Sequence, residues 1–297
     1  MKANNKPVQF LEHTKLNDMV CRSRFDIGSS HNHIKFLLLS DLHIDNPKCD
    51  RDLLFKVLNK AKAENAYILI FGDLFCLMQG KGDPRRNKGD IRPEHNKANY
   101  IDAVIQDTAK LLKPYANNIL LLADGNHETS IIKHIEVDPI EYLVSYLHKV
   151  NPRIVHMGYQ GFYILNSSIG NSATMDNHLF FHHGAFSGPV TKGTMSVSRY
   201  SSITKADVVV SGHTHDTWYV EHPFYEVNQK NKKVVVKTQY HIKTGTFKQE
   251  YLQPNGFQIE RQVLPKPLGG WWMEYSRDLE SETRMYMNPK FKFYKAD

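Results

Sequence analysis

Five short clusters of side chains that can bind metal ions occur between residues 41 and 215. They read Asp41-Leu42-His43, Gly72-Asp73, Gly125-Asn126-His127-Glu128, His182-His183-Gly184 and Gly212-His213-Thr214-His215. These clusters contain no cysteine, so they offer carboxylate, amide and imidazole donors that suit Mn, Fe, Zn, Ni or Co. Two such ions about 3.5 to 4 Å apart can hold the attacking and leaving oxygens of a phosphoryl transfer.

Each cluster follows a continuous apolar run, which is typical of a strand buried on both faces. The runs cover residues 34–41, 67–73, 118–124, 178–184 and 207–213. Helices are predicted after an Asp50 cap, at about 98–113 and near 138–149. Strands that alternate with helices predict a layered α/β fold, in which ligands bind beyond the carboxyl ends of the strands.

The sequence outside these runs predicts three regions. Residues 1–33 are polar and irregular, so we expect an N-terminal extension or poorly packed arm before a domain at 34–250. Residues 217–247 indicate a long hairpin with a charged turn at 228–233, which begins a β-rich C-terminal part. Residues 251–297 are expected to be an extension packed on the same domain.

The motifs DLH, GDLF, GNHE, HHG and GHTH resemble the signature blocks of the calcineurin-like metallophosphoesterase superfamily. The resemblance implies an α/β fold, a two-sheet β-sandwich flanked by helices, with two divalent ions at the strand ends. It implies that a hydroxide bridging the ions attacks phosphorus. Mn²⁺ is the expected metal, with Fe, Zn, Ni or Co as alternatives. The implied ligands are Asp41, His43 and His215 for the first ion, Asp73 as the bridge, and Asn126, His183 and His213 for the second.

The same resemblance implies that His127 is no ligand but faces the substrate and protonates the leaving oxygen. Neighbours in a strand point to opposite faces, so we expect only one of His182 and His183 to face the ions. The family position selects His183 and leaves His182 a packing or supporting role. Cys76 follows GDLF, where the repair-exonuclease branch of the superfamily usually has a histidine, so the sequence departs from that branch here.

Three acidic residues near these motifs are expected to have other roles. Glu128 is expected to cap a helix or support a histidine. Asp45 and Asp124 are expected to have surface or turn roles.

The basic charge, the GDLF motif and an arginine-rich loop indicate a nucleic-acid substrate. The chain carries a net charge of +7, which favours polyanionic partners. Residues 79–97 are rich in arginine and lysine, and Arg85 and Arg86 could grip phosphates, although a solvated loop is an equal interpretation. Residues 185–202 could close the other side of the cleft or be an ordinary connector. Trp271 and Trp272 could stack bases, although core packing is commoner.

We therefore expect a phosphodiesterase or nuclease that acts on DNA or RNA. The alternatives are a phosphomonoesterase or small-molecule (nucleotide) phosphodiesterase, and a non-catalytic scaffold. A looser likeness to phage- and prophage-type phosphoesterases gives no substrate. The sequence has no apolar run long enough for a membrane helix and no secretory signal, so we expect a cytoplasmic protein without a membrane partner. Its three scattered cysteines are expected to be free, and protein partners stay open.

Overall fold

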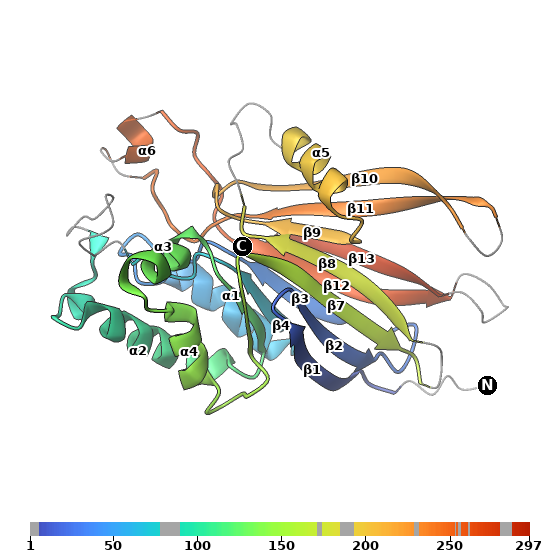
Figure 1. Ribbon diagram of the computed structural model, residues 1–297, viewed down its shortest axis with the longest axis horizontal. Coiled ribbons are helices and arrows are strands. Elements are labelled where there is room, and N and C mark those ends of the chain that lie inside the picture. The colour runs from blue at the N-terminus through green and yellow to red at the C-terminus, as the bar shows by residue number, and fades with distance from the viewer. Residues whose placement is uncertain are drawn as a thin grey trace.

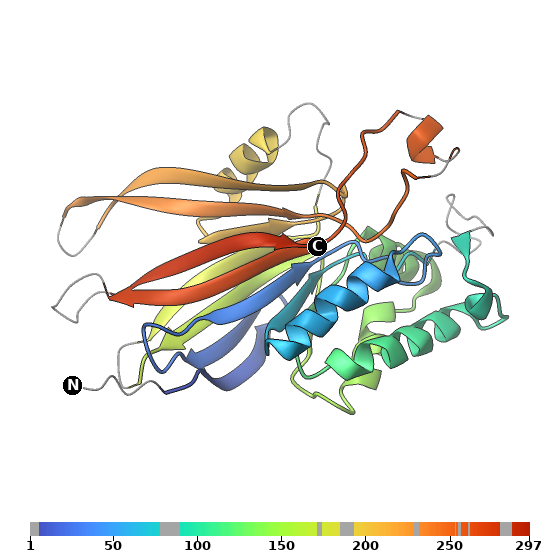
Figure 2. The ribbon, with the colours of Figure 1, turned by 180° about the vertical axis from the view of Figure 1, so that it is seen from behind.

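The computed structural model describes residues 6–77, 90–170, 174–184, 193–228, 232–252, 254, 257–260, 262–279 and 287–297. Two mixed β-sheets face each other within this part of the chain, with helices outside them (Figures 1 and 2). This arrangement confirms the predicted α/β fold with a two-sheet sandwich. None of its described helices is long and apolar enough to cross a membrane.

The seven-stranded sheet has the order β1-β2-β7-β8-β9-β11-β10. Its strands are β1 (Gln9–Asn17), β2 (Val20–Asp26), β7 (Gln160–Ser168), β8 (Met175–His182), β9 (Val208–Ser211), β10 (Thr217–Val227) and β11 (Val234–Thr244). Strands β10 and β11 form the predicted hairpin, paired from Thr217 with Thr244 to Val227 with Val234.

The six-stranded sheet has the order β13-β12-β3-β4-β5-β6. Its strands are β3 (Ile34–Leu39), β4 (Tyr67–Phe71), β5 (Ile119–Ala123), β6 (Val155–Met157), β12 (Gly270–Leu279) and β13 (Met287–Ala296). Apolar residues alternate between two buried faces: Phe36 and Leu38 pack between the sheets, whereas Leu37 and Leu39 pack against helices. Burial on both faces explains the uninterrupted apolar run.

Three of the described helices lie where the sequence predicted them, after Asp50, at about 98–113 and near 138–149. The described helices are α1 (Arg51–Ala63), α2 (Tyr100–Leu112), α3 (Asn126–Ile135), α4 (Pro139–Leu147), α5 (Thr194–Ile203) and the short α6 (Phe257–Glu260), with 3-10 turns at Pro93–His95 and Lys113–Tyr115. The Asp50 side chain caps α1 by accepting a hydrogen bond from Leu53 N at 2.9 Å. Helices α1 to α4 gather at one end of the molecule, and α5 lies apart beside the seven-stranded sheet (Figure 1).

The prediction that residues 1–33 form an irregular arm is wrong. Strand β2 pairs in parallel with β7, and β1 pairs with β2, so this segment completes one edge of a sheet. His13 of β1 is buried and its Nε2 atom donates to the carbonyl oxygen of Leu120, in the other sheet, at 3.0 Å. His13 is the one buried residue of β1, so the polar positions of this strand concealed it.

Two further expectations need correction. Residues 251–297 do not simply pack on the domain, because β12 lies inside the six-stranded sheet between β13 and β3. Of the connector expected at 185–202, residues 194–203 form α5, whereas 185–192 lie outside the described residues. Trp271 and Trp272 on β12 are buried, which favours core packing over base stacking.

The strands that precede the five motifs end at one edge of the molecule. Strands β3, β4 and β5 run parallel in one sheet, and β8 and β9 run parallel in the other. Because the carboxyl ends of parallel strands lie at the same edge, the residues that follow them meet across the two sheets.

Candidate metal centre

Two groups of side chains meet where these strands end. The first is Asp41, His43 and His215, and the second is Asp73, His183 and His213. Within each group, one ligand atom from every residue lies within 4.8 Å of the others. The structure therefore brings together the residues for which the sequence predicted shared ions.

The first group has two imidazole nitrogens directed at each other. The Nε2 atoms of His43 and His215 are 3.1 Å apart, and the Nε2 atom of His215 is 3.5 Å from Oδ1 of Asp41. Burial, with smaller contributions from nearby positive groups, holds the pKa of both histidines well below the usual value, so both rings are neutral. Neutral imidazoles beside a buried carboxylate are the donors that a divalent cation requires.

The second group is arranged around Asn126, the amide that the sequence places in this set. Its Oδ1 atom is 2.6 Å from His213 Nδ1 and 3.2 Å from His183 Nε2. The other ring nitrogen of His183 donates to the carbonyl oxygen of Phe71 at 2.8 Å. That hydrogen bond directs Nε2 toward the centre, as the supporting partner of a metal-binding histidine does.

The charges of this region fit a bound cation. His183 Nε2 lies 3.2 Å from Oδ2 of Asp73 and 4.0 Å from Oδ1 of Asp41, so it stands between the two groups. Burial opposes the charged form, but the two carboxylates raise the pKa of His183 to about 9. Although burial acts in the opposite direction, His183 and His127 hold the pKa of Asp73 well below its usual value. The carboxylates thus favour positive charge where a metal ion would lie, so the residues present fit the implied ions.

The backbone of these turns is unusual. Asp41, His43, Asp73, His213 and His215 all have φ between 45° and 72°, in the left-handed region. Residues other than glycine rarely adopt this backbone conformation, and those that do are found most often at functional sites. Each strand therefore ends in a sharp change of direction, which allows residues two apart, such as Asp41 and His43, to join one group.

Gly125 permits the closest approach between two of the motifs. A Cβ atom at this position would lie 2.1 Å from Oδ1 of Asp73 and 2.3 Å from its backbone nitrogen. Asp73 occupies that space, and its Oδ1 atom accepts from the N–H of His127 at 3.0 Å. The GNHE turn is thus held directly against the predicted bridging carboxylate.

His127 lies beside both groups and belongs to neither. Its Nδ1 atom donates to the carbonyl oxygen of Cys76, and its Nε2 atom is 3.9 Å from Oδ2 of Asp73. A carbonyl can only accept, so Nδ1 carries a hydrogen and Nε2 is the ring nitrogen on the side of Asp73. This placement is compatible with the predicted substrate-facing role.

Glu128 supports the centre through three backbone hydrogen bonds. Its buried carboxylate accepts from the N–H groups of Asp73, Phe75 and Gly125 at 3.0, 2.9 and 2.7 Å. Helix α3 begins at Asn126 with Gly125 as its cap residue, so the predicted helix-capping role of Glu128 is confirmed. Burial and the charge of Asp73 raise the pKa of Glu128 to about 8.

Of the surface or turn roles expected for Asp45 and Asp124, the surface role is wrong for both, because both are buried, whereas Asp45 does lie in a turn. Asp45 is 2% exposed and accepts from Cys76 N and Leu77 N, which secures the chain after Asp73. Asp124 is 7% exposed, and its Oδ1 atom pairs with His156 Nε2 at 2.9 Å. Both carboxylates are buried because they have fixed partners, and those partners lie far away in the sequence.

Two residues that support the centre were not predicted from the sequence. Ser40 donates from Oγ to Asp41 Oδ2. The ring of Tyr159 lies edge-on to His183, with centroids 5.3 Å apart, and its hydroxyl donates to Gly184 O at 2.8 Å. The adjacency of Ser40 to the DLH motif was a usable signal, whereas nothing near Tyr159 in the sequence indicated its position. His182 packs against Tyr159, with centroids 5.2 Å apart, as expected for a packing residue.

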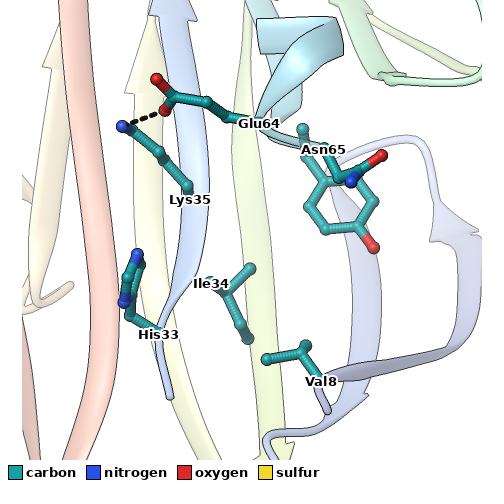
Figure 3. Close-up of a pocket in the computed structure, with 7 residues that line it drawn as sticks. Val8, His33, Ile34, Lys35, Glu64 and Asn65 are labelled. Atoms are coloured by element: carbon teal, nitrogen blue, oxygen red, sulfur yellow. Dashed lines mark hydrogen bonds and ion pairs between the residues drawn. The ribbon is translucent and has the colours of Figure 1, made fainter. Parts of the chain in front are cut away.

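Other predicted features lie elsewhere. Arg85 and Arg86 fall outside the described residues, so their role stays a prediction. A cavity of about 420 Å³ near the start of β3 is lined by Val8, His33, Ile34, Lys35, Glu64, Asn65 and Tyr67, and by none of the predicted site residues (Figure 3). All three cysteines are free and buried, as expected.

The solved structures that match this chain are distant from it in sequence. The calcineurin-like phosphoesterase YfkN from Bacillus subtilis is 11% identical, with 89% of this chain and 91% of that chain covered and a TM-score of 0.40. A metallophosphoesterase from Sphaerobacter thermophilus is 14% identical, with 88% of this chain and 88% of that chain covered and a TM-score of 0.34. Wild-type Vps29 complexed with Zn²⁺ from Entamoeba histolytica is 11% identical, with 89% of this chain and 100% of that chain covered and a TM-score of 0.36. Among curated protein sequences, no relative matches the chain.

The sequence also matches a family model. The model is described as calcineurin-like phosphoesterase and covers residues 34–217, which enclose all five motifs. This range is more than half of the 297 residues. The chain therefore belongs to the calcineurin-like phosphoesterase family.

Proposed function

We propose that this chain is a phosphodiesterase that uses two divalent metal ions, most simply Mn²⁺, to cleave nucleic acid. The carrying observation is the convergence of the two donor groups, with Asn126 and His127 beside them. Family membership supports a metal-dependent hydrolase acting on phosphate esters. A scaffold would not need every one of these donors buried or half-buried and directed at its neighbours.

We assign the ligands of the two ions as follows. Asp41, His43 and His215 would hold one ion, and Asn126, His183 and His213 the other, with Asp73 shared between them. When bound, the ions would supply an activated water and neutralise charge on the phosphate.

His127 would act on the leaving group. Its Nδ1–H bond to the Cys76 carbonyl fixes the ring, so the protonated form of His127 would deliver its Nε2 proton to the leaving oxygen and keep the hydrogen on Nδ1.

Charge supports a polymeric substrate. The net charge of +7 favours a polyanion, and Arg85 and Arg86 follow the Asp73 turn in sequence. The positive charges of Lys248 and Lys266 help to lower the pKa of His215. However, the Nζ atom of Lys248 lies 3.0 Å from a carboxylate oxygen of Glu250, and that of Lys266 lies 3.9 Å from one of Asp216. Net charge is therefore a stronger support for nucleic acid than the immediate surroundings of the centre. Kinship with phage-type or repair-exonuclease enzymes, and a cytoplasmic location, stay predictions.

The test is an assay with added Mn²⁺ against p-nitrophenyl phosphate, bis(p-nitrophenyl) phosphate, and labelled single- and double-stranded DNA and RNA. We expect hydrolysis of the diester and of at least one nucleic acid, and no activity from the matched Asp73→Asn variant. Activity confined to the monoester would contradict the substrate proposal. A metal-loaded protein inactive on all substrates would contradict the enzymatic proposal.

A further inference from the structure

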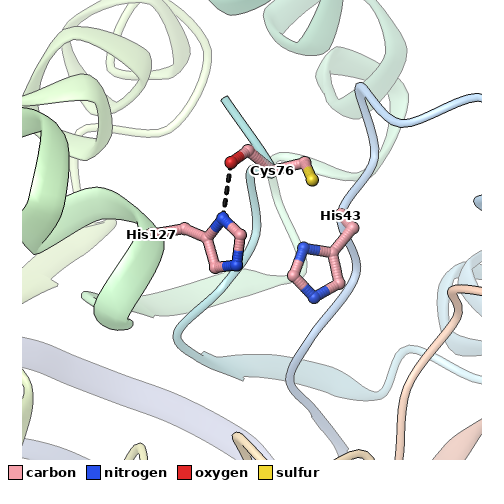
Figure 4. Close-up of side chains that lie close together, drawn as sticks. All are labelled: His43, Cys76 and His127. Atoms are coloured by element: carbon pink, nitrogen blue, oxygen red, sulfur yellow. Dashed lines mark hydrogen bonds between the residues drawn. The ribbon is translucent and has the colours of Figure 1, made fainter. Parts of the chain in front are cut away.

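A third cluster of metal-capable atoms lies against the other ring nitrogen of His43. Whereas Nε2 of His43 faces His215, its Nδ1 atom is directed toward Cys76 and His127 (Figure 4). One ligand atom from each of His43, Cys76 and His127 lies within 4.8 Å of the others, and all three residues are buried. The cluster therefore adjoins the metal centre and adds a sulfur donor that the centre lacks.

The Nδ1 atom of His43 has no hydrogen-bond partner among the described residues, although it is fully buried. A buried polar atom without a partner is unfavourable and usually marks a bound water, an ion or a functional role. Here the atom points into a cluster that contains a thiol and a second imidazole. This unpartnered nitrogen is independent evidence that the cluster receives a ligand.

The chemistry of the cluster differs from that of the two donor groups. Cys76 is a free cysteine, 1% exposed, and its Sγ atom accepts from Asn46 Nδ2 at 3.2 Å. Sulfur with two imidazoles favours soft or borderline ions such as Zn²⁺ and Cd²⁺ over Mn²⁺. Tetrahedral zinc separates such ligand atoms by about 3.3 to 3.6 Å, so the side chains need to close by no more than about 1.5 Å.

We propose that His43, Cys76 and His127 form a third cation site, selective for thiophilic metals, whose occupation inhibits the enzyme. On binding, the Cys76 thiol loses its proton to water and a sulfur–metal bond forms. The two imidazoles complete three protein ligands and leave one position for water. The reaction needs no oxidant or reductant.

The inhibitory part of this proposal rests on the proposed function. A neutral imidazole has one lone pair, so a His43 that binds through Nδ1 carries its hydrogen on Nε2. The first donor group is then left with Asp41 and His215. His127 is withdrawn from the substrate at the same time. Occupation of the third site therefore competes with the catalytic arrangement of both histidines.

The experiment measures the site without relying on activity. The full chain is loaded with excess Mn²⁺ and titrated with Cd²⁺, and the ultraviolet charge-transfer absorption of a cadmium–thiolate bond is recorded. We expect this absorption in the wild type, its loss in Cys76→Ser, and its retention in Cys49→Ser, a control at another buried free cysteine. Absorption that persists in Cys76→Ser, or is absent from the wild type, overturns the site.

The second readout is hydrolysis of bis(p-nitrophenyl) phosphate under the same conditions. We expect the Cd²⁺ concentration for half-inhibition to rise by about tenfold or more in Cys76→Ser, because losing even a group that only supports a ligand costs about 10- to 100-fold in metal affinity, and Cys76 is itself a ligand. Equal inhibition of wild type and Cys76→Ser overturns the inhibitory role. If the chain hydrolyses no phosphate ester, the proposed function fails, yet the absorption still decides the site.

If Cys76→Ser fails to fold, two further measurements test the proposal. Cys76→Ala then replaces Cys76→Ser, with thermal unfolding as the check on folding. Cadmium-edge X-ray absorption of the wild type with one equivalent of Cd²⁺ gives a measurement without any substitution. A sulfur atom in the first shell supports the site, and a shell of nitrogen and oxygen alone overturns it.

Discussion

A single methyl group at Gly125 should disable the proposed metal centre. In Gly125→Ala the new Cβ would lie 2.1 Å from Oδ1 of Asp73, whereas ordinary contacts of a Cβ atom begin at 3.4 Å. The difference requires Asp73 or the GNHE turn to move by about 1 Å, and a misplacement of that size costs about 10²-fold in rate. We therefore expect kcat/KM to fall by about 10²-fold, together with weaker Mn²⁺ binding.

The assay compares diester hydrolysis, manganese content and thermal unfolding of the variant with those of Gly158→Ala. Gly158 is a matched control because a Cβ there would meet no atom within 4 Å. The control should keep wild-type activity. Wild-type activity and manganese affinity in Gly125→Ala would refute the view that close contact between this turn and Asp73 builds the centre.

Further predictions concern other residues. His127→Ala should keep both metals and lower turnover by about 10²-fold or more, the range for lost general-acid help; loss of metal from the variant would make His127 a ligand. Arg85→Ala with Arg86→Ala should flatten the salt dependence of nucleic-acid binding, and an unchanged slope would remove these arginines from the substrate contact. Burial opposes the charged form of His156, but Asp124 and neighbouring carboxylates raise its pKa. Protonated His156 therefore stabilises the fold fully below a pH of about 6.5, and this stabilisation is lost as the pH rises through the raised pKa of the folded state. His156→Gln should accordingly lower the melting temperature most at acid pH; an equal deficit at pH 5 and pH 9 would contradict this.

The fold was predictable where burial is complete. Strands β3, β4 and β5 are apolar throughout because sheet and helices cover both faces. Strand β1 was missed because it lies at a sheet edge and buries few of its residues. Edge strands retain polar residues, so hydrophobic periodicity indicates them poorly.

The candidate metal centre was likewise predictable only in part. The spacing of the motifs predicted which residues meet, but their left-handed backbone is visible only in the structure. Asp45 and Asp124 were misread because a carboxylate is usually exposed, and only the fold supplies their partners. The unpartnered Nδ1 of His43 likewise arises from tertiary packing and leaves no trace in the sequence.

The central claim is that two ions share Asp73 at the junction of the two donor groups. Manganese content measured with electron paramagnetic resonance tests it most directly, because ions joined by one carboxylate are magnetically coupled. The account predicts two Mn²⁺ per chain with a coupled spectrum, and loss of the coupling in Asp73→Asn. A single uncoupled Mn²⁺ per chain, or a coupled pair that survives Asp73→Asn, would contradict it.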